Sequence, residues 1–170
     1  MNDTRNIDKI YRDGMSEFVN ENFERSIEIL SEAVALDPDR KLTYVSRGSA
    51  QLKLNRLNEA LADFNRAIEL DSNYARAFHL RGLVAEKSGD DSGALEDFNR
   101  AIEINPEYGA AYHSRATLHV KMGHEDLAVE DIAMVQHLTN KNIETFANES
   151  NVWRSQHLRL ESVMESELGR

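Results

Sequence analysis

Two charged series with regular spacing contain the residues of this chain best suited to chemistry. They are Arg47, Arg81 and Arg115 on the one hand, and Asp63, Asp97 and Asp131 on the other. Members of each series lie 34 residues apart, and such groups could form a ligand clamp or an acid–base site. One unit earlier, Asp13 and Ile29 replace both partners together. We therefore predict that each arginine pairs with the aspartate sixteen residues later, as an exposed structural contact contributing about 0–1 kcal/mol.

A pair of histidines, His79 and His113, shares the same spacing and is expected to lie side by side. Two imidazoles could begin a metal site, but structural zinc needs four ligands and catalytic zinc three, and no third ligand is evident. The sequence contains no cysteine, nucleophile elbow, phosphate-binding loop or histidine–glutamate zinc motif. We therefore predict no metal, no cofactor and no enzyme activity, with both histidines as polar lining of a groove or as a weak pH-sensitive contact.

A lysine series, Lys53, Lys87 and Lys121, falls near the ends of three predicted helices. Cations at a helix C-terminus stabilise the helix by about 0.3–1 kcal/mol each, which explains the series without any ligand. The same ammonium groups could instead line one edge of a groove that binds an acidic peptide. Both interpretations remain open from the sequence.

The elements that position these residues follow the same 34-residue period. Small residues recur at Gly14, Gly48, Gly82 and Ala116, and large apolar residues recur at Leu30, Phe64, Phe98 and Ile132. A period of roughly 20–50 residues is typical of a solenoid, in which each unit buries its apolar face only against its neighbours.

The clearest unit spans residues 75–108 and reads as a helical hairpin. Small and apolar residues at spacings of three and four predict one helix over 77–86 and a second from about residue 91. Gly89 suits a left-handed helix end, Asp90 or Asp91 can cap the second helix, and Asn105-Pro106 stops it. The same interpretation applies to the neighbouring units, with Ser72 and Asn140 in place of proline.

These hairpins resemble the tetratricopeptide repeat. The resemblance rests on an aromatic residue and glycine in the first helix (Phe78 and Gly82) and on Ala94, Phe98, Ala101 and Pro106 in the second. It covers residues 7–142 as four repeats, 7–40, 41–74, 75–108 and 109–142, after an N-terminal segment 1–6. It implies an all-α solenoid of four helical hairpins whose first helices line a concave groove.

The C-terminal segment, residues 143–170, continues the period. Phe146 and Ser150 fall where a fifth first helix needs a large and a small residue, and an apolar stripe from Trp153 to Leu168 extends it. We expect this helix to cap the open end of the stack, since solenoid ends must be closed. A homodimer through residues 151–168 is the alternative.

By the family's geometry, the groove residues come from the four first helices. They are Tyr11, Met15 and Phe18; Val45, Ser49, Leu52 and Lys53; His79, Leu83, Glu86 and Lys87; and His113, Thr117, Val120 and Lys121. Aromatic and methionine side chains favour binding hot spots, so Tyr11, Met15 and Phe18 are the predicted anchors, although they could equally bury themselves against the N-terminal residues. The lysine and asparagine of the chaperone-binding carboxylate clamp are replaced by Tyr11 and Met15, which argues against that ligand class.

The charge separates into two layers. The four first-helix segments sum to +6 and the four second-helix segments to −14, within a net charge of −10. This balance favours an acidic ligand in the groove and argues against nucleic acid. No apolar run is long enough for a signal peptide or a membrane span, so we expect a cytoplasmic protein without membrane association.

The predicted function is a non-enzymatic protein–protein interaction module that binds an acidic segment of a partner in the concave groove. A homo-oligomeric scaffold assembled through the C-terminal helix is an alternative. A secretion-type chaperone is a narrower form of the first prediction.

Overall fold

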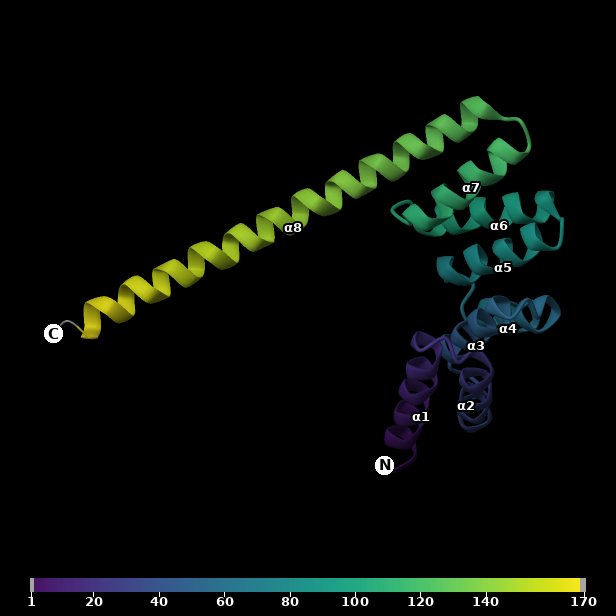
Figure 1. Cartoon of the computed structure of the whole chain (residues 1–170), viewed down its shortest axis with the longest axis horizontal. Coiled ribbons are helices and arrows are strands. Elements are labelled where there is room, and N and C mark those ends of the chain that lie inside the picture. Colours follow the sequence, from purple (N-terminus) through teal and green to yellow (C-terminus); the bar gives the residue numbers. More distant parts are fainter. Residues whose placement is uncertain (1, 169–170) are drawn as a thin grey trace.

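The computed structural model describes the backbone of residues 2–168 and the side chains of residues 6–146 and 148. Over this range the chain is all-helical (Figure 1). The helices are α1 (Asn2–Val19), α2 (Phe23–Leu36), α3 (Lys41–Lys53), α4 (Leu57–Leu70), α5 (Ala75–Lys87), α6 (Asp91–Ile104), α7 (Gly109–Lys121) and α8 (Glu125–Leu168). Consecutive helices pair as hairpins, α1 with α2 through to α7 with α8, which confirms the predicted fold.

The hairpins stack so that their first helices form the inner layer. Each second helix packs against the first helix of the next hairpin, and α1, α3, α5 and α7 also contact one another in succession. Among the described residues, α2, α4 and α6 do not pack against one another. The stack therefore curves with its first helices on the concave side, where the sequence places the groove.

The period of small and large residues reflects a close approach within each hairpin. A Cβ atom at Gly82 would lie 2.6 Å from Cε1 of Phe98, and one at Gly48 would lie 2.8 Å from Cε1 of Phe64. Both phenylalanines are fully buried, so their rings have no space into which to move. The ring occupies the space that the glycine leaves, and this contact fixes the two helices of the hairpin.

Three of the turns between hairpins share one local device. The side chains of Asp37, Asp71 and Asn105 accept a hydrogen bond from the backbone N–H two residues later, at 3.3, 2.9 and 3.1 Å. These Asx turns end α2, α4 and α6. Within the hairpin 75–108, Gly89 has a φ of 83°, and Asp90 caps α6 by accepting from the N–H of Gly93, both as predicted.

The predicted helix end at Asn140 is wrong, because α8 runs without a break from Glu125 to Leu168. Thr139 stands where the other repeats have Asp or Asn, and its hydroxyl donates to the Val135 carbonyl at 2.8 Å inside the helix. No glycine or proline interrupts residues 125–168. The fifth first helix is therefore the continuation of α8, and Phe146 is 73% exposed. The side chains of Ser150, Trp153 and the predicted capping residues lie outside the described residues.

Candidate functional site

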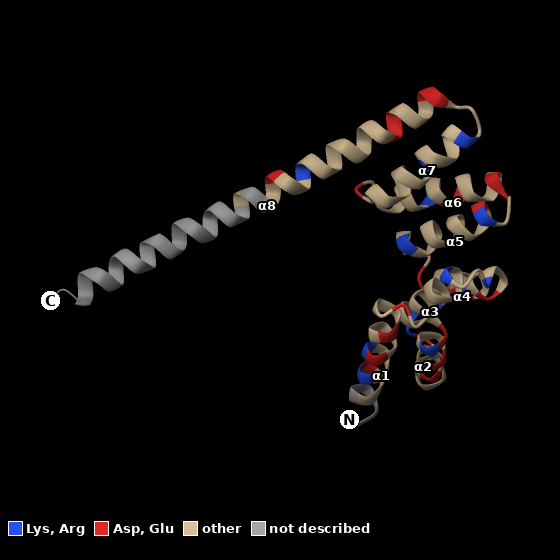
Figure 2. Ribbon diagram, viewed as in Figure 1, with Lys and Arg blue, Asp and Glu red and all other residues tan. Residues whose placement is uncertain are grey.

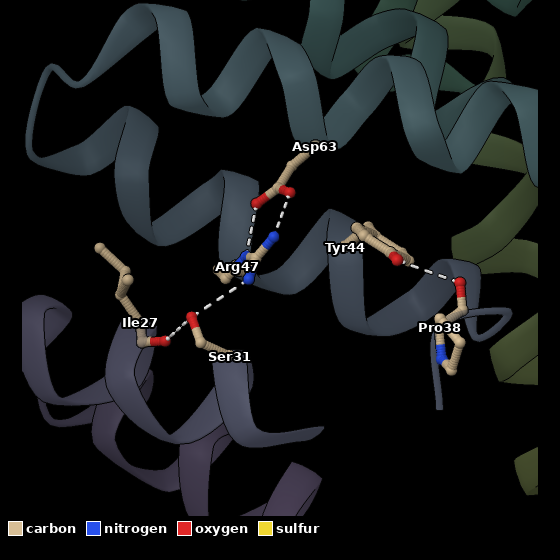
Figure 3. Close-up of polar contacts among 6 residues, drawn as sticks. All are labelled: Ile27, Ser31, Pro38, Tyr44, Arg47 and Asp63. Carbon is tan, nitrogen blue, oxygen red and sulfur yellow. Dashed lines mark hydrogen bonds and ion pairs between the residues drawn. The ribbon is translucent and has the colours of Figure 1, made fainter. Parts of the chain in front are cut away.

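The two charged series form one structural network. Arg81 donates from Nε and Nη2 to the two carboxylate oxygens of Asp97 at 2.8 and 2.7 Å, which confirms pairing within the hairpin. Its Nη1 also donates to Oδ1 of Asn65 in the preceding hairpin at 2.9 Å. Figure 3 shows the equivalent arrangement around Arg47, which contacts Asp63 and Ser31. Each arginine thus joins three helices.

The carboxylates of these pairs are buried, which the sequence did not predict. Asp63, Asp97 and Asp131 are only 5%, 7% and 4% exposed, so the expectation that the pairs are exposed is wrong. The hydrogen bonds to aspartate raise the pKa of each arginine in spite of its partial burial. Because every group in the network already has a partner, the arginines and aspartates are not available to a ligand.

His79 is a buried, satisfied side chain. Its Nδ1 lies 3.2 Å from the Tyr108 hydroxyl and its Nε2 lies 2.9 Å from the Ser114 hydroxyl, and the residue is 7% exposed. Burial lowers the pKa of His79 to about 4, and the positive charge of Arg76 adds to the effect. His113 is exposed on α7, so the structure does not bring the two histidines together as one polar lining.

The buried His79 predicts a pH-dependent stability. The unfolded chain takes up a proton near the ordinary pKa of 6.5, whereas the folded chain does so only near pH 4, so stability is lost as the pH falls between these values. Between pH 7 and pH 5 this difference amounts to about 2 kcal/mol. The His79→Gln variant should lose that part of the slope in urea titrations, leaving a residual slope from His119, whose pKa burial also lowers. An unchanged slope would contradict this assignment.

Tyr11 and Val45 lie at the repeat position of His79, and they too lie between successive first helices. The Tyr11 hydroxyl is 3.0 Å from the Ser46 hydroxyl, and the Arg40 guanidinium lies 4.7 Å from the centre of the Tyr11 ring. Val45 is 2% exposed. The prediction that Val45 and His79 line the groove surface is therefore wrong, because neighbouring first helices cover both side chains.

A hollow on the concave side does gather other predicted residues. It has a volume of about 430 Å³ and lies between α1, α3 and α5. Its lining consists of Phe18, Ser49, Leu52, Lys53, Arg76, Leu80, Leu83, Glu86 and Lys87. Leucines from two helices thus lie beside three cations and one carboxylate. The arrangement can accommodate an apolar side chain together with a negatively charged group.

The remaining predicted groove residues lie outside this hollow. Met15 is half-buried on α1, and Thr117 is exposed on α7, with its hydroxyl donating to the His113 carbonyl at 3.0 Å. Lys121 forms an ion pair with Asp91 of α6. That contact supports the structural interpretation for Lys121, while Lys53 and Lys87 have no ion-pair partner among the described side chains.

Sequence reasoning missed two residues of the hollow, Arg76 and Leu80. Arg76 lies in the first turn of α5, and its equivalents one repeat away are Leu42 and Ala110, so no periodic series marks it. Leu80 was overlooked because its equivalents, Ser46 and Ser114, are polar. Both residues differ in type from their equivalents in the neighbouring repeats. An argument based on the period looks for residues that recur, so it does not identify residues that differ.

The stacked hairpins place the chain in the class of α-solenoids, whose concave face is assembled from successive repeats. Residues 48–89 match the family described as "TPR repeat", and residues 75–108 match the family described as "Tetratricopeptide repeat". Residues 48–108 therefore carry tetratricopeptide repeats, as the sequence resemblance indicates. No curated protein sequence matches it.

Solved structures share this fold. A crystal structure of MamA has a TM-score of 0.73 and 27% identity, over 82% of this chain and 81% of that one. The first TPR domain of Spaghetti (RPAP3), bound to an HSP90 peptide, has a TM-score of 0.66 and 20% identity, over 69% and 93%. The Arabidopsis OM64 TPR domain has a TM-score of 0.65 and 21% identity, over 68% and 96%.

The fold and the family define a protein–protein interaction module. Its concave face is formed by pre-organised helices, which suits the binding of a partner segment without large rearrangement. Among the described helices, none combines the length and the apolar character needed to cross a membrane.

Proposed function

We propose that the hollow between α1, α3 and α5 binds an acidic segment of a partner protein that carries a large apolar side chain. The observation that supports this most is the position of Lys53, Arg76 and Lys87 beside the leucines of the hollow. These leucines, which we call the apolar floor, are Leu52, Leu80 and Leu83. Leucine or aromatic side chains of the partner would contact Leu52 and Leu83. Acidic groups beside them would face the cations.

The charge of the hollow favours this ligand. Three cations and one carboxylate, Glu86, line it, so its surface is positive although the chain carries a net charge of −10. Figure 2 shows acidic residues on the second helices and basic residues at both ends of α5. A positive groove in an acidic protein attracts an acidic segment and repels a basic one.

The apolar floor supplies the affinity. Phe18 contacts Phe23 edge to face, with ring centres 5.4 Å apart, so it is held in place at one end of the hollow. Leu52, Leu80 and Leu83 are each partly exposed, and covering them with an apolar side chain removes their surface from water. Apolar anchors provide most of the binding free energy in such sites, while the charges select the partner.

A similar fold holds an acidic peptide. The Spaghetti (RPAP3) domain is bound to the HSP90 peptide SRMEEVD, which contains two glutamates and an aspartate. In the present chain Tyr11 and Met15 stand where the chaperone-binding carboxylate clamp has lysine and asparagine. We therefore propose a different means of holding the ligand, through the cations of α3 and α5.

The site works by binding, and we propose no catalysis. The paired arginines and aspartates are part of the stack, and His79 is enclosed by Tyr108 and Ser114. Among the described residues no group of three histidines or acidic side chains could hold a metal ion. A cytoplasmic setting belongs to the same proposal.

The experiment is a selection from a random peptide library displayed on phage, with the full chain as bait. The wild-type protein should enrich acidic peptides with a leucine or an aromatic residue. The Lys53→Glu/Lys87→Glu variant should bind the enriched peptides at least tenfold more weakly, because two attractive charges become repulsive.

The matched control is Arg25→Glu/Arg100→Glu, which changes the net charge equally but on α2 and α6, where both arginines are exposed. It should bind like the wild type, and both variants should keep the wild-type helicity in circular dichroism. Equal losses in the two variants, or enrichment of basic peptides, would overturn the proposal.

A further inference from the structure

Helix α8 has an apolar face that nothing in the described structure covers. Val129, Ile132, Ile143 and Phe146 are 65%, 46%, 61% and 73% exposed. Their spacings of three, eleven and three place them within one stripe along the helix. Leu138, on another side of α8, is buried and faces Gly109 of α7. Hence α8 uses one face for its own hairpin and exposes a second.

This stripe continues in the sequence with a seven-residue period. After Ile143 and Phe146, residues Ser150, Trp153, His157, Leu160 and Met164 follow at alternating spacings of four and three. Positions of this kind are the a and d positions of a coiled coil. Gln136 and Thr139 interrupt the stripe near the stack. From residue 143 onwards five of the seven positions are apolar, the exceptions being Ser150 and His157.

The chain's own stack does not use this stripe. The helix continues through Thr139 and Asn140 without a turn, so the segment after them does not fold back as a separate fifth helix. The polar network also ends here, because Glu149 replaces the next arginine and Ala133 replaces the asparagine that would bind it. Ile132, whose equivalents Phe64 and Phe98 are fully buried, is left exposed.

We propose that the stripe pairs with the same stripe of a second copy, in a parallel two-stranded coiled coil over residues 143–164. One flanking pair of opposite charges favours a second copy in this orientation. With Ile143 at position a, Glu149 falls at position g and Arg154 at the following position e. In a parallel pair these positions face each other between the two chains, where opposite charges attract.

The pairing has a consequence for binding. Two copies joined at their C-terminal helices present two concave hollows in one assembly. A partner with two acidic segments, or two partner chains held together, would bind with an effective concentration set by the span between the hollows. This consequence rests on the proposed function, whereas the dimer itself does not.

Light scattering of the full chain over a dilution series tests the dimer. The mass should be twice that of one chain at high concentration. The Phe146→Glu/Trp153→Glu variant should be a monomer at every concentration, because it places charges in the seam. Asn148→Glu/Ser155→Glu adds the same charges at position f, away from the seam, and should stay dimeric.

The orientation is tested by single cysteines, since the chain has none of its own. A parallel, in-register pair brings the two copies of residue 150 together, so Ser150→Cys should form a disulfide-linked dimer on mild oxidation, and Asn148→Cys should not. A monomeric wild-type chain, a dimer that survives Phe146→Glu/Trp153→Glu, or equal cross-linking of both cysteine variants would overturn the proposal.

Discussion

The free energy of unfolding should fall by about 3 kcal/mol when Asp97 is replaced by alanine. This carboxylate is 7% exposed and accepts both of its hydrogen bonds from Arg81, so its removal leaves a partly buried guanidinium without a counter-ion. The Arg81 side chain is 29% exposed, and contact with water keeps the loss at the lower end for a broken buried pair. Urea denaturation followed by circular dichroism measures the change.

Two companion variants separate the pair from a general loss of charge. Glu96→Ala removes an exposed carboxylate on the same helix, next to Asp97, and should change stability by less than about 0.5 kcal/mol. Arg81→Leu/Asp97→Leu removes both partners and should recover much of the loss, because no charge remains unpaired. A loss of under about 1 kcal/mol for Asp97→Ala would mean that the pair contributes no more than an exposed salt bridge, and would contradict the expected effect of its burial.

Replacing Phe98 by alanine should cost still more, about 4 kcal/mol. The ring is fully buried against Gly82 and contacts Ala94 of its own helix and Leu118 of the next hairpin. Its removal leaves a cavity where α5, α6 and α7 meet, and the close packing between hairpins limits how far they can collapse into it. Thermal and urea unfolding of the variant provide the measurement.

The chain supplies its own control at the equivalent position of the last repeat. Ile132 is 46% exposed because no further first helix packs against it, so Ile132→Ala should cost less than about 1 kcal/mol. Similar losses at the two positions would mean that the end of the stack is covered, and would contradict the exposed face of α8.

The architecture could be predicted from the sequence because residues that make equivalent packing contacts recur at the repeat period. A glycine opposite a phenylalanine, repeated at Gly48 with Phe64 and Gly82 with Phe98, is possible only where two helices approach closely. Arg–Asp pairing was also predictable, since both partners are absent from the first repeat together. The burial of the pairs was not, because periodicity indicates which residues are equivalent and does not reveal how deeply they lie.

The end of the array was harder to predict. A helix end at Asn140 follows from the period alone, yet Thr139 lacks the carboxylate or amide with which Asp37, Asp71 and Asn105 form their turns. A threonine hydroxyl can bond to a carbonyl within the helix, as Thr139 does, and this allows the helix to continue. The side chain at the expected turn, and not the repeat period, therefore determines whether the helix ends there.

The candidate site was predicted in part. Lys53, Lys87, Leu52 and Leu83 lie in the hollow, whereas Val45 and His79 are enclosed between helices. Helical spacing places all of them on the inner layer, but it does not distinguish the part of that layer that faces outwards from the part that contacts the next helix. That difference depends on the distance between neighbouring helices, which only the assembled stack defines.

The most direct test of the proposed groove is a nuclear magnetic resonance titration of the full, isotope-labelled chain with the acidic peptide that the selection enriches most. Amide shifts should change at Ser49, Leu52, Leu80 and Leu83, and the Lys53→Glu/Lys87→Glu variant should need at least tenfold more peptide for the same changes. Changes confined to α2, α4 and α6, or to α7 and α8, would contradict binding in the concave hollow.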